Sequence, residues 1–130
     1  MDFDFNRYIE DFNASDDESK FVAKYYTEDL VVDGPQGTMH GRQAWVDMLE
    51  ATHVGIKERL QPIMVVREGD KVMAESNATF TASQDRLDFP FGPLKKGESV
   101  TVRFFASYRL RGHQVAHVTL GFWLPSMRKG

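Results

Sequence analysis

The hydrophobic period of this sequence changes once along the chain, and no other feature restricts the possible folds as strongly. In the first part, apolar residues recur at steps of three and four, which is the period of an amphipathic helix. From Lys57 onward, apolar and polar residues alternate, which is the period of a half-buried strand. Long strands in series without helices between them indicate an antiparallel meander. The sequence therefore predicts an α+β fold in which three helices pack on a mostly antiparallel sheet.

Three helices are expected before the meander. The first carries a single apolar stripe, formed by Phe5, Tyr8, Ile9 and Phe12. Ser15 is followed by three acidic residues, a pattern typical of an N-cap and first turn, so it is expected to cap the second helix. The third helix is expected to begin at 41–44. A short strand at 30–32, ended by a turn at 33–37 that contains Gly and Pro, separates the second helix from the third.

Four long strands are expected, at 56–67, 71–81, 99–109 and 114–124. The side chains of the third long strand that should face the helices are Val102, Phe104, Ala106, Tyr108 and Leu110. In the last strand, apolar residues occupy both faces. A sheet that is apolar on both faces needs a cover for the second one. A homodimer through the sheet is the simplest such cover.

Size, charge and cysteine content exclude several classes of protein. The 130 residues fit a single domain over 1–130. The formal net charge is −3, so no general attraction to nucleic acid or to an anionic membrane is expected. The N-terminus does not resemble a signal peptide, and no stretch approaches the roughly 18 apolar residues of a membrane span. With no cysteine and no His-Glu-x-x-His pattern, neither a metal nor another cofactor is expected, and the expected location is cytoplasmic.

Five short segments carry a resemblance to a known superfamily; they lie at 7–10, 26–35, 40–42, 97–103 and 112–117. The first, Arg-Tyr-Ile-Glu, resembles the segment that holds the oxyanion-binding Tyr of ketosteroid isomerases, and the second resembles the segment that holds their catalytic Asp. The last two are similar to the final strands of SnoaL-like polyketide cyclases. The chain thus resembles the nuclear-transport-factor-two-like (NTF2-like) superfamily over residues 3–124. The resemblance implies one SnoaL-like domain, a curved sheet that closes a cone of helices around a pocket.

Three candidate catalytic residues follow from the resemblance and from side-chain chemistry: Tyr8, Asp33 and His117. A phenol in a dry pocket can donate a hydrogen bond to a developing oxyanion, although Tyr8 could equally be a core residue. Asp33 facing a hydrophobic cavity would have a raised pKa and act as a base, or it could be a turn residue bonded to its own backbone. His117 would carry a proton with Tyr8 or Tyr108 as its partner, or it could be a structural residue of its strand.

Further residues are candidates for a ligand pocket or its surroundings. The candidate wall residues are Phe21, Tyr25, Trp45, Met48, Phe104, Tyr108 and Trp123. The loop at 87–94 is expected either to cover the pocket or to fold against the sheet edge or a partner. Glu75 and Asn77 share one strand face, and the apolar residues opposite them favour a solvent-facing position. His40 and His53 flank the third helix without a carboxylate at metal-ligand spacing.

Two functions are compatible with this pattern. The first is a cofactor-free isomerase, cyclase or dehydratase that moves protons on a small apolar carbonyl, polyketide or terpenoid compound. The second is a non-catalytic ligand-binding or dimerisation module of the same fold. Two departures favour the second function, because Gly34 and Phe104 occupy the positions where the isomerases carry acidic residues.

Overall fold

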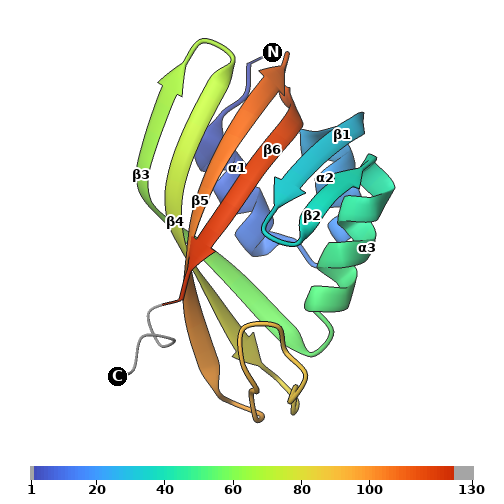
Figure 1. Cartoon of the computed structure of the whole chain (residues 1–130), viewed down its shortest axis with the longest axis vertical. Coiled ribbons are helices and arrows are strands. Elements are labelled where there is room, and N and C mark those ends of the chain that lie inside the picture. The colour runs from blue at the N-terminus through green and yellow to red at the C-terminus, as the bar shows by residue number, and fades with distance from the viewer. Residues whose placement is uncertain (1, 125–130) are drawn as a thin grey trace.

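Two helices, a short β-hairpin, a third helix and four long strands follow one another in a computed structural model, which describes residues 2–124. The helices are α1 (Phe5–Ala14), α2 (Glu18–Tyr25) and α3 (Arg42–Thr52). The strands are β1 (Tyr26–Gly34), β2 (Gly37–His40), β3 (Ile56–Glu68), β4 (Lys71–Ala82), β5 (Ser99–Arg111) and β6 (Gln114–Trp123). Figure 1 shows the three helices on one face of the curved sheet. The predicted α+β class is confirmed.

The six strands form one sheet in the order β2-β1-β6-β5-β4-β3. Every neighbouring pair is antiparallel except β1 and β6, which run parallel. The chain leaves β1 through the β2 hairpin and α3, makes the meander, and returns in β6 beside β1. The last strand, β6, therefore lies in the sheet between the first strand, β1, and β5. The helices α1 and α3 cover the same inner face of this sheet (Figure 1).

The starts of the helices follow from side chains that satisfy their free amide groups. Asp4 caps α1 by accepting a hydrogen bond from the Arg7 amide. The predicted cap of α2 is wrong: Asp17, not Ser15, accepts from the Lys20 amide and caps the helix. The Ser15 hydroxyl instead bonds the backbone of Asp17 and shapes the turn between the two helices.

The first strand is longer than the sequence pattern predicted. β1 begins at Tyr26 rather than Leu30: the exposed pair Glu28 and Asp29 interrupts the apolar run, and the pairing with β6 has a bulge between Tyr26 and Val31. The predicted turn at 33–37 is the tip of a hairpin, and β2 pairs back onto β1. The hairpin adds a sixth strand that the sequence pattern did not predict.

The alternation in the long strands places their apolar sets on the inner face, as predicted. In β5, Val102, Ala106 and Leu110 are buried, and in β4 so are Val72 and Phe80. Each fully buried side chain of this kind contributes about 1.5–3 kcal/mol relative to exposure. These residues divide into two clusters, one beneath the helices and one beneath the loop at 83–98.

The loop between β4 and β5 packs on the sheet at the end that the helices leave open. Phe89 and Leu94 are buried there, and the Phe89 ring lies 5.2 Å from that of Phe80. Of the alternatives for this loop, packing against the sheet is the one observed. The apolar loop residues thus extend the core beyond the reach of the helices.

The outer face of the sheet carries both a polar network and exposed apolar side chains. Arg103 donates to Glu75 at 2.6 Å and to Asn77 at 2.8 Å, which confirms that these two residues lie on the face opposite the core. Exposed apolar residues of β3–β6 include Met64, Val66, Met73, Phe105 and Trp123.

Candidate functional site

A cavity of about 250 Å³ opens between the first two helices and the end of α3 where it joins β3. Its wall consists of Phe12, Ser15, Asp16, Glu18, Phe21, Leu49, His53, Ile56, Lys57 and Glu58. Phe12 and Phe21 meet edge to face with ring centroids 5.3 Å apart, so one wall is aromatic. Such a mixture of apolar wall and a few polar groups is typical of a small-molecule site. At about 250 Å³ the cavity is slightly smaller than the roughly 300–1,000 Å³ usual for such sites.

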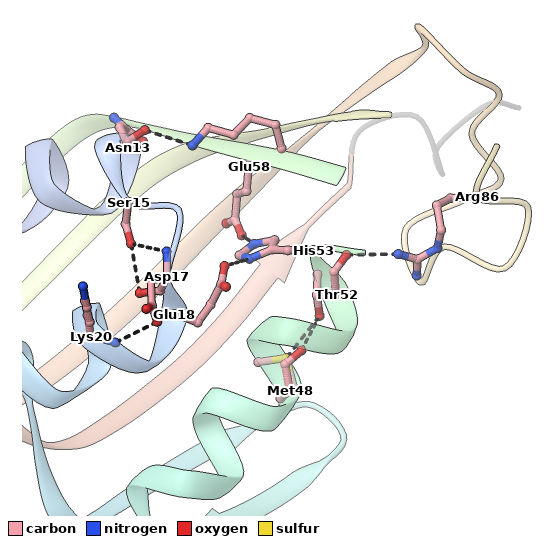
Figure 2. A network of polar contacts seen from close by, with 11 residues as sticks. Asn13, Ser15, Asp17, Glu18, Lys20, Met48, Thr52, His53, Glu58 and Arg86 are labelled. Atoms are coloured by element: carbon pink, nitrogen blue, oxygen red, sulfur yellow. Dashed lines mark hydrogen bonds and ion pairs between the residues drawn. The ribbon is translucent and has the colours of Figure 1, made fainter. Parts of the chain in front are cut away.

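His53 holds the polar side of the cavity together. It follows the last turn of α3, and each of its ring nitrogens contacts a carboxylate: Nδ1 lies 2.7 Å from Glu18 and Nε2 lies 2.8 Å from Glu58. Figure 2 shows the imidazole between these two side chains. The side chains of His53 and Glu58 are only 13% and 10% exposed, against 25% for Glu18. The half-buried cluster therefore joins three elements, α2, α3 and β3, at the wall of the cavity.

The two carboxylates decide the protonation of His53. Burial alone lowers the pKa of an imidazole, but the hydrogen bonds and charges of Glu58 and then Glu18 outweigh it, and the net pKa of His53 is raised above its ordinary value. In the protonated form both ring nitrogens carry hydrogen and donate, one to each carboxylate. In that form the cluster can supply a proton, and each carboxylate keeps a second oxygen that can accept one.

Three tyrosines lie behind the aromatic wall. The hydroxyls of Tyr8 and Tyr26 form a short hydrogen bond, and the Tyr108 ring lies 6.0 Å from that of Tyr8. Burial raises the pKa of Tyr8 and of Tyr26 well above the usual range, and it raises the pKa of Tyr108 to about 12. The Phe21 ring lies 5.3 Å from that of Tyr8. These phenols therefore stay protonated as donors, one aromatic layer from the cavity.

Trp45 adds a further donor to this layer. Its ring lies 6.3 Å from that of Tyr26, and its Nε1–H is buried. The Trp45 indole lowers the raised pKa of Tyr26, so its N–H faces the phenol oxygen.

Asp33 and His117 meet on the opposite face of the sheet. Asp33 accepts hydrogen bonds from the Thr38 hydroxyl at 2.6 Å and from His117 Nε2 at 2.7 Å. Their neighbours Val32 and Val118 point into the core, so these two side chains point outward and are 41% and 40% exposed. The hydrogen bonds from Thr38 and then His117 lower the pKa of Asp33, contrary to the predicted rise. The prediction that Tyr8 or Tyr108 partners His117 is also wrong, because the sheet separates them.

The seven predicted wall residues do not share one cavity. Phe21 lines the cavity. Trp45 is buried and Met48 and Tyr108 pack against the main core, while Phe104 packs with the second core cluster. Tyr25 donates a short hydrogen bond to Asp11. Trp123 lies at the end of β6 and is partly exposed. Most of the predicted aromatic wall residues therefore belong to the hydrophobic core rather than to the cavity.

Sequence reasoning missed the carboxylates of the cavity. Glu18 lies 35 positions before His53, and Glu58 lies five positions after it on a strand. Neither spacing matches a metal or catalytic motif, which is why the expectation of no carboxylate at metal-ligand spacing gave no hint of these two partners. The inward position of Glu58 could have been read from the sequence, because Glu58 lies two positions from both Ile56 and Leu60 and so shares the inner face of β3 with them. A charged residue in an apolar set is expensive to bury without a partner.

Two absences hold for the described residues. Over 2–124, no grouping of three His, Cys, Asp or Glu side chains could hold a metal ion. Glu18 and Glu58 bind different nitrogens of His53, so the three groups do not converge on one point. Within the same range, no helix is long and apolar enough to cross a membrane.

Comparison with solved structures shows the fold again. The chain matches a candidate polyketide cyclase from Xanthomonas campestris pv. campestris with 25% identity and a TM-score of 0.76, covering 95% of this chain and 90% of that one. A candidate polyketide cyclase from Pseudomonas putida KT2440 matches with 25% identity and a TM-score of 0.71, covering 89% and 86%. A protein of ketosteroid isomerase-like fold from Catenulispora acidiphila, in complex with trimethylamine, matches with 15% identity and a TM-score of 0.68, covering 89% and 82%.

Sequence comparison gives the family. No curated protein sequence matches the chain significantly. The sequence profile of the SnoaL-like domain matches residues 5–118, which includes α1 and the cavity and ends within β6. The resemblance to the NTF2-like superfamily is thereby confirmed, and the chain belongs to the SnoaL-like domain family.

Proposed function

We propose that this SnoaL-like domain binds a small, largely apolar organic molecule in the His53 cavity and acts on it by cofactor-free acid–base chemistry. One observation carries the proposal: a half-buried imidazole is held between two carboxylates in the wall of an aromatic-lined cavity. Convergent titratable groups in a cavity are the mark of an acid–base site. The reaction class is isomerisation, cyclisation or dehydration of a carbonyl, polyketide or terpenoid compound, and the two candidate cyclases at 25% identity support it.

The cavity residues divide the proton chemistry between them. When a substrate oxygen displaces Glu18 from Nδ1, protonated His53 donates to this leaving or carbonyl oxygen, and the second oxygen of Glu58 accepts a proton from carbon. After product release, exchange with solvent returns a proton to Nδ1 and removes one from Glu58. Phe12 and Phe21 hold the apolar part of the molecule.

The three residues first assigned to catalysis keep different positions in this proposal. Tyr8 is the predicted oxygen-stabilising donor, and the Phe21 ring separates it from the cavity. Asp33 and His117 are the alternative proton carriers, on the outer face. Substitution of each histidine separates the two assignments.

A ligand survey with matched histidine variants tests the proposal. Wild type, His53→Gln and His117→Gln are screened by thermal shift against cyclic enones, aromatic polyketides, terpenoid epoxides and steroids, and the mixtures are then analysed for products. A bound ligand raises the melting temperature by mass action. We expect one class to stabilise wild type and to be converted, with conversion lost in His53→Gln and kept in His117→Gln. Conversion that depends on His117 and not on His53 would move the site to the outer face.

A second candidate function is a non-catalytic ligand-binding module that dimerises through the sheet. The exposed Met64, Met73 and Phe105 on the outer face favour this interface, because a second copy would cover them. Light scattering on wild type and Phe105→Glu tests the interface. A dimer that becomes a monomer in Phe105→Glu supports it, and a wild-type monomer at high concentration contradicts it. Ligand binding without conversion would favour the module over the enzyme.

A further inference from the structure

Arg86 lies outside the cavity and yet bonds the backbone on both sides of His53. Its Nη1 donates to the carbonyl of Val54 at 2.7 Å and to that of Thr52 at 3.2 Å. These are the residues directly before and after His53 in the chain. Figure 2 shows Arg86 reaching from the 83–98 loop to the end of α3. Its side chain is only 12% exposed, so it is part of the packed structure rather than a mobile surface group.

The guanidinium is itself fixed at several points. Its Nε donates to Asp88 at 3.1 Å, and the group lies 5.5 Å from the centre of the Phe89 ring. The Arg86 backbone pairs with Leu94 through two hydrogen bonds, of 2.7 and 2.9 Å. Phe89 and Leu94 are buried in the second core cluster. The loop thus connects that cluster rigidly to the end of α3.

All four carbonyls of the segment 52–55 are occupied. Arg86 binds the first and third, the Ile56 amide binds that of His53, and the Ser83 amide binds that of Gly55. Without Arg86, the carbonyl that ends α3 and that of Val54 would lose their protein donors. A cation at a helix C-terminus also favours the helix dipole. The backbone conformation that aims His53 at both carboxylates therefore depends on the loop.

We infer that Arg86 is a positioning residue, which sets the His53 imidazole between Glu18 and Glu58. This inference rests on the proposed function for its role in catalysis. The charged groups that face His53 are Glu18 from α2 and Glu58 from β3, and Asp16 and Lys57 line the same cavity. Arg86 reaches His53 through the backbone and not through a side-chain contact.

Titration of the histidines by NMR tests the inference without a substrate. The full chain has four histidines, so His40, His113 and His117 serve as internal references, and His53→Gln identifies the fourth signal. In Arg86→Gln and in Arg86→Lys we expect the His53 pKa to fall by about half a unit or more, because the imidazole leaves its optimal position between the carboxylates. Lysine keeps the charge but lacks the planar fork that binds both carbonyls and Asp88 together.

The direction of the shift separates positioning from a simple charge effect. Loss of a nearby positive charge alone would raise the His53 pKa in Arg86→Gln and leave it unchanged in Arg86→Lys, and either result would overturn the inference. Arg103→Gln, on the outer face of the sheet, is the control and should leave the His53 pKa unchanged. If Arg86→Gln does not fold, Arg86→Lys and Asp88→Asn decide, and Asp88→Asn should give a smaller fall.

The titration also separates this inference from the proposed function. If the His53 pKa is lowered in the Arg86 variants but wild type converts no compound, the proposed enzymatic function is contradicted and the positioning role of Arg86 is supported. Conversion by wild type, with an unchanged His53 pKa in both Arg86 variants, would contradict the positioning alone.

Discussion

The molecule carries two histidine–carboxylate clusters, one on each face of the same sheet, and they differ in burial more than in geometry. His53 lies 2.7 and 2.8 Å from two carboxylates and is 13% exposed, while His117 lies 2.7 Å from one carboxylate and is 40% exposed. The inner cluster shares a cavity with Phe12 and Phe21. The outer cluster shares a strand surface with Thr38. The two clusters therefore have hydrogen bonds of nearly equal length but lie in different environments.

Burial changes what such a pair can do. In a dry wall, charge–charge interactions are stronger than at a surface, and the carboxylates raise the pKa of His53 despite its desolvation. At the surface, solvent screens the pair, and exposed ion pairs contribute little to stability. The inner cluster is therefore the stronger candidate for chemistry, and the following predictions compare the two.

The largest expected difference is in turnover. His53→Gln should lower kcat/KM by about 10²–10⁴-fold, which is the usual contribution of a general acid or base. His117→Gln, the matched change on the outer face, should leave kcat/KM within about twofold of wild type. The measurement is steady-state kinetics on whichever compound the survey identifies. Equal losses in the two variants would mean that burial does not distinguish the clusters.

The next difference is in stability. Glu58→Gln should lower the free energy of unfolding by about 1.5–3 kcal/mol, because it weakens a charge-assisted hydrogen bond in a buried position. Asp33→Asn should produce no measurable change in the urea midpoint, since water can replace its partners. Urea denaturation at pH 7 compares the two, with circular dichroism confirming the native fold. A larger loss in Asp33→Asn would reverse the assignment.

The buried phenol pair gives a smaller effect that sharpens the position of the site. Tyr8→Phe leaves the Tyr26 hydroxyl without its partner and should cost about 1–2 kcal/mol of unfolding free energy. If the phenol also binds a substrate oxygen, kcat should fall while the thermal shift caused by ligand is retained. Denaturation and kinetics on the same variant separate the two roles. An unchanged kcat would leave Tyr8 as a core residue.

The smallest expected effect is in the pH dependence of stability. The pKa of His53 is raised in the folded state, so its contribution is fully present below about pH 6.5 and is lost as pH rises through the folded pKa. The pKa of Asp33 is lowered, so its contribution is present above about pH 3.9 and is lost as pH falls through the folded pKa. The difference in stability between wild type and His53→Gln should therefore shrink as pH rises from about 6.5 through the folded pKa of His53. A constant difference would contradict the charged state of His53.

The periodicity of the sequence was sufficient for the fold class and for most of its elements, because burial imposes the helix and strand periods on the chain directly. The inner set of β5 and the start of α3 were predicted correctly for this reason. The β2 strand was missed, because it has only four residues, follows directly on the turn at 33–37 and shows no apolar alternation. The parallel pairing of β1 with β6 also has no local pattern, since it joins segments about 85 positions apart.

The site was less predictable than the fold, because it is assembled from side chains that are distant in sequence. The sequence analysis singled out Asp33 and His117, and the structure brings them together on the outer face. Which face of the sheet their side chains occupy depends on the register of the strand, because a shift by one residue moves every side chain to the opposite face. His53 and Glu18 become partners only when α2 and α3 pack together. No spacing rule contains that information.

The most direct test of the account is a crystal structure of the protein with a ligand taken from the survey. We predict electron density for the ligand in the cavity, with a polar atom within hydrogen-bond distance of His53 or Glu58 and an apolar part against Phe21. Ligand bound beside Asp33 and His117 on the outer face, with the inner cavity closed, would contradict the central claim.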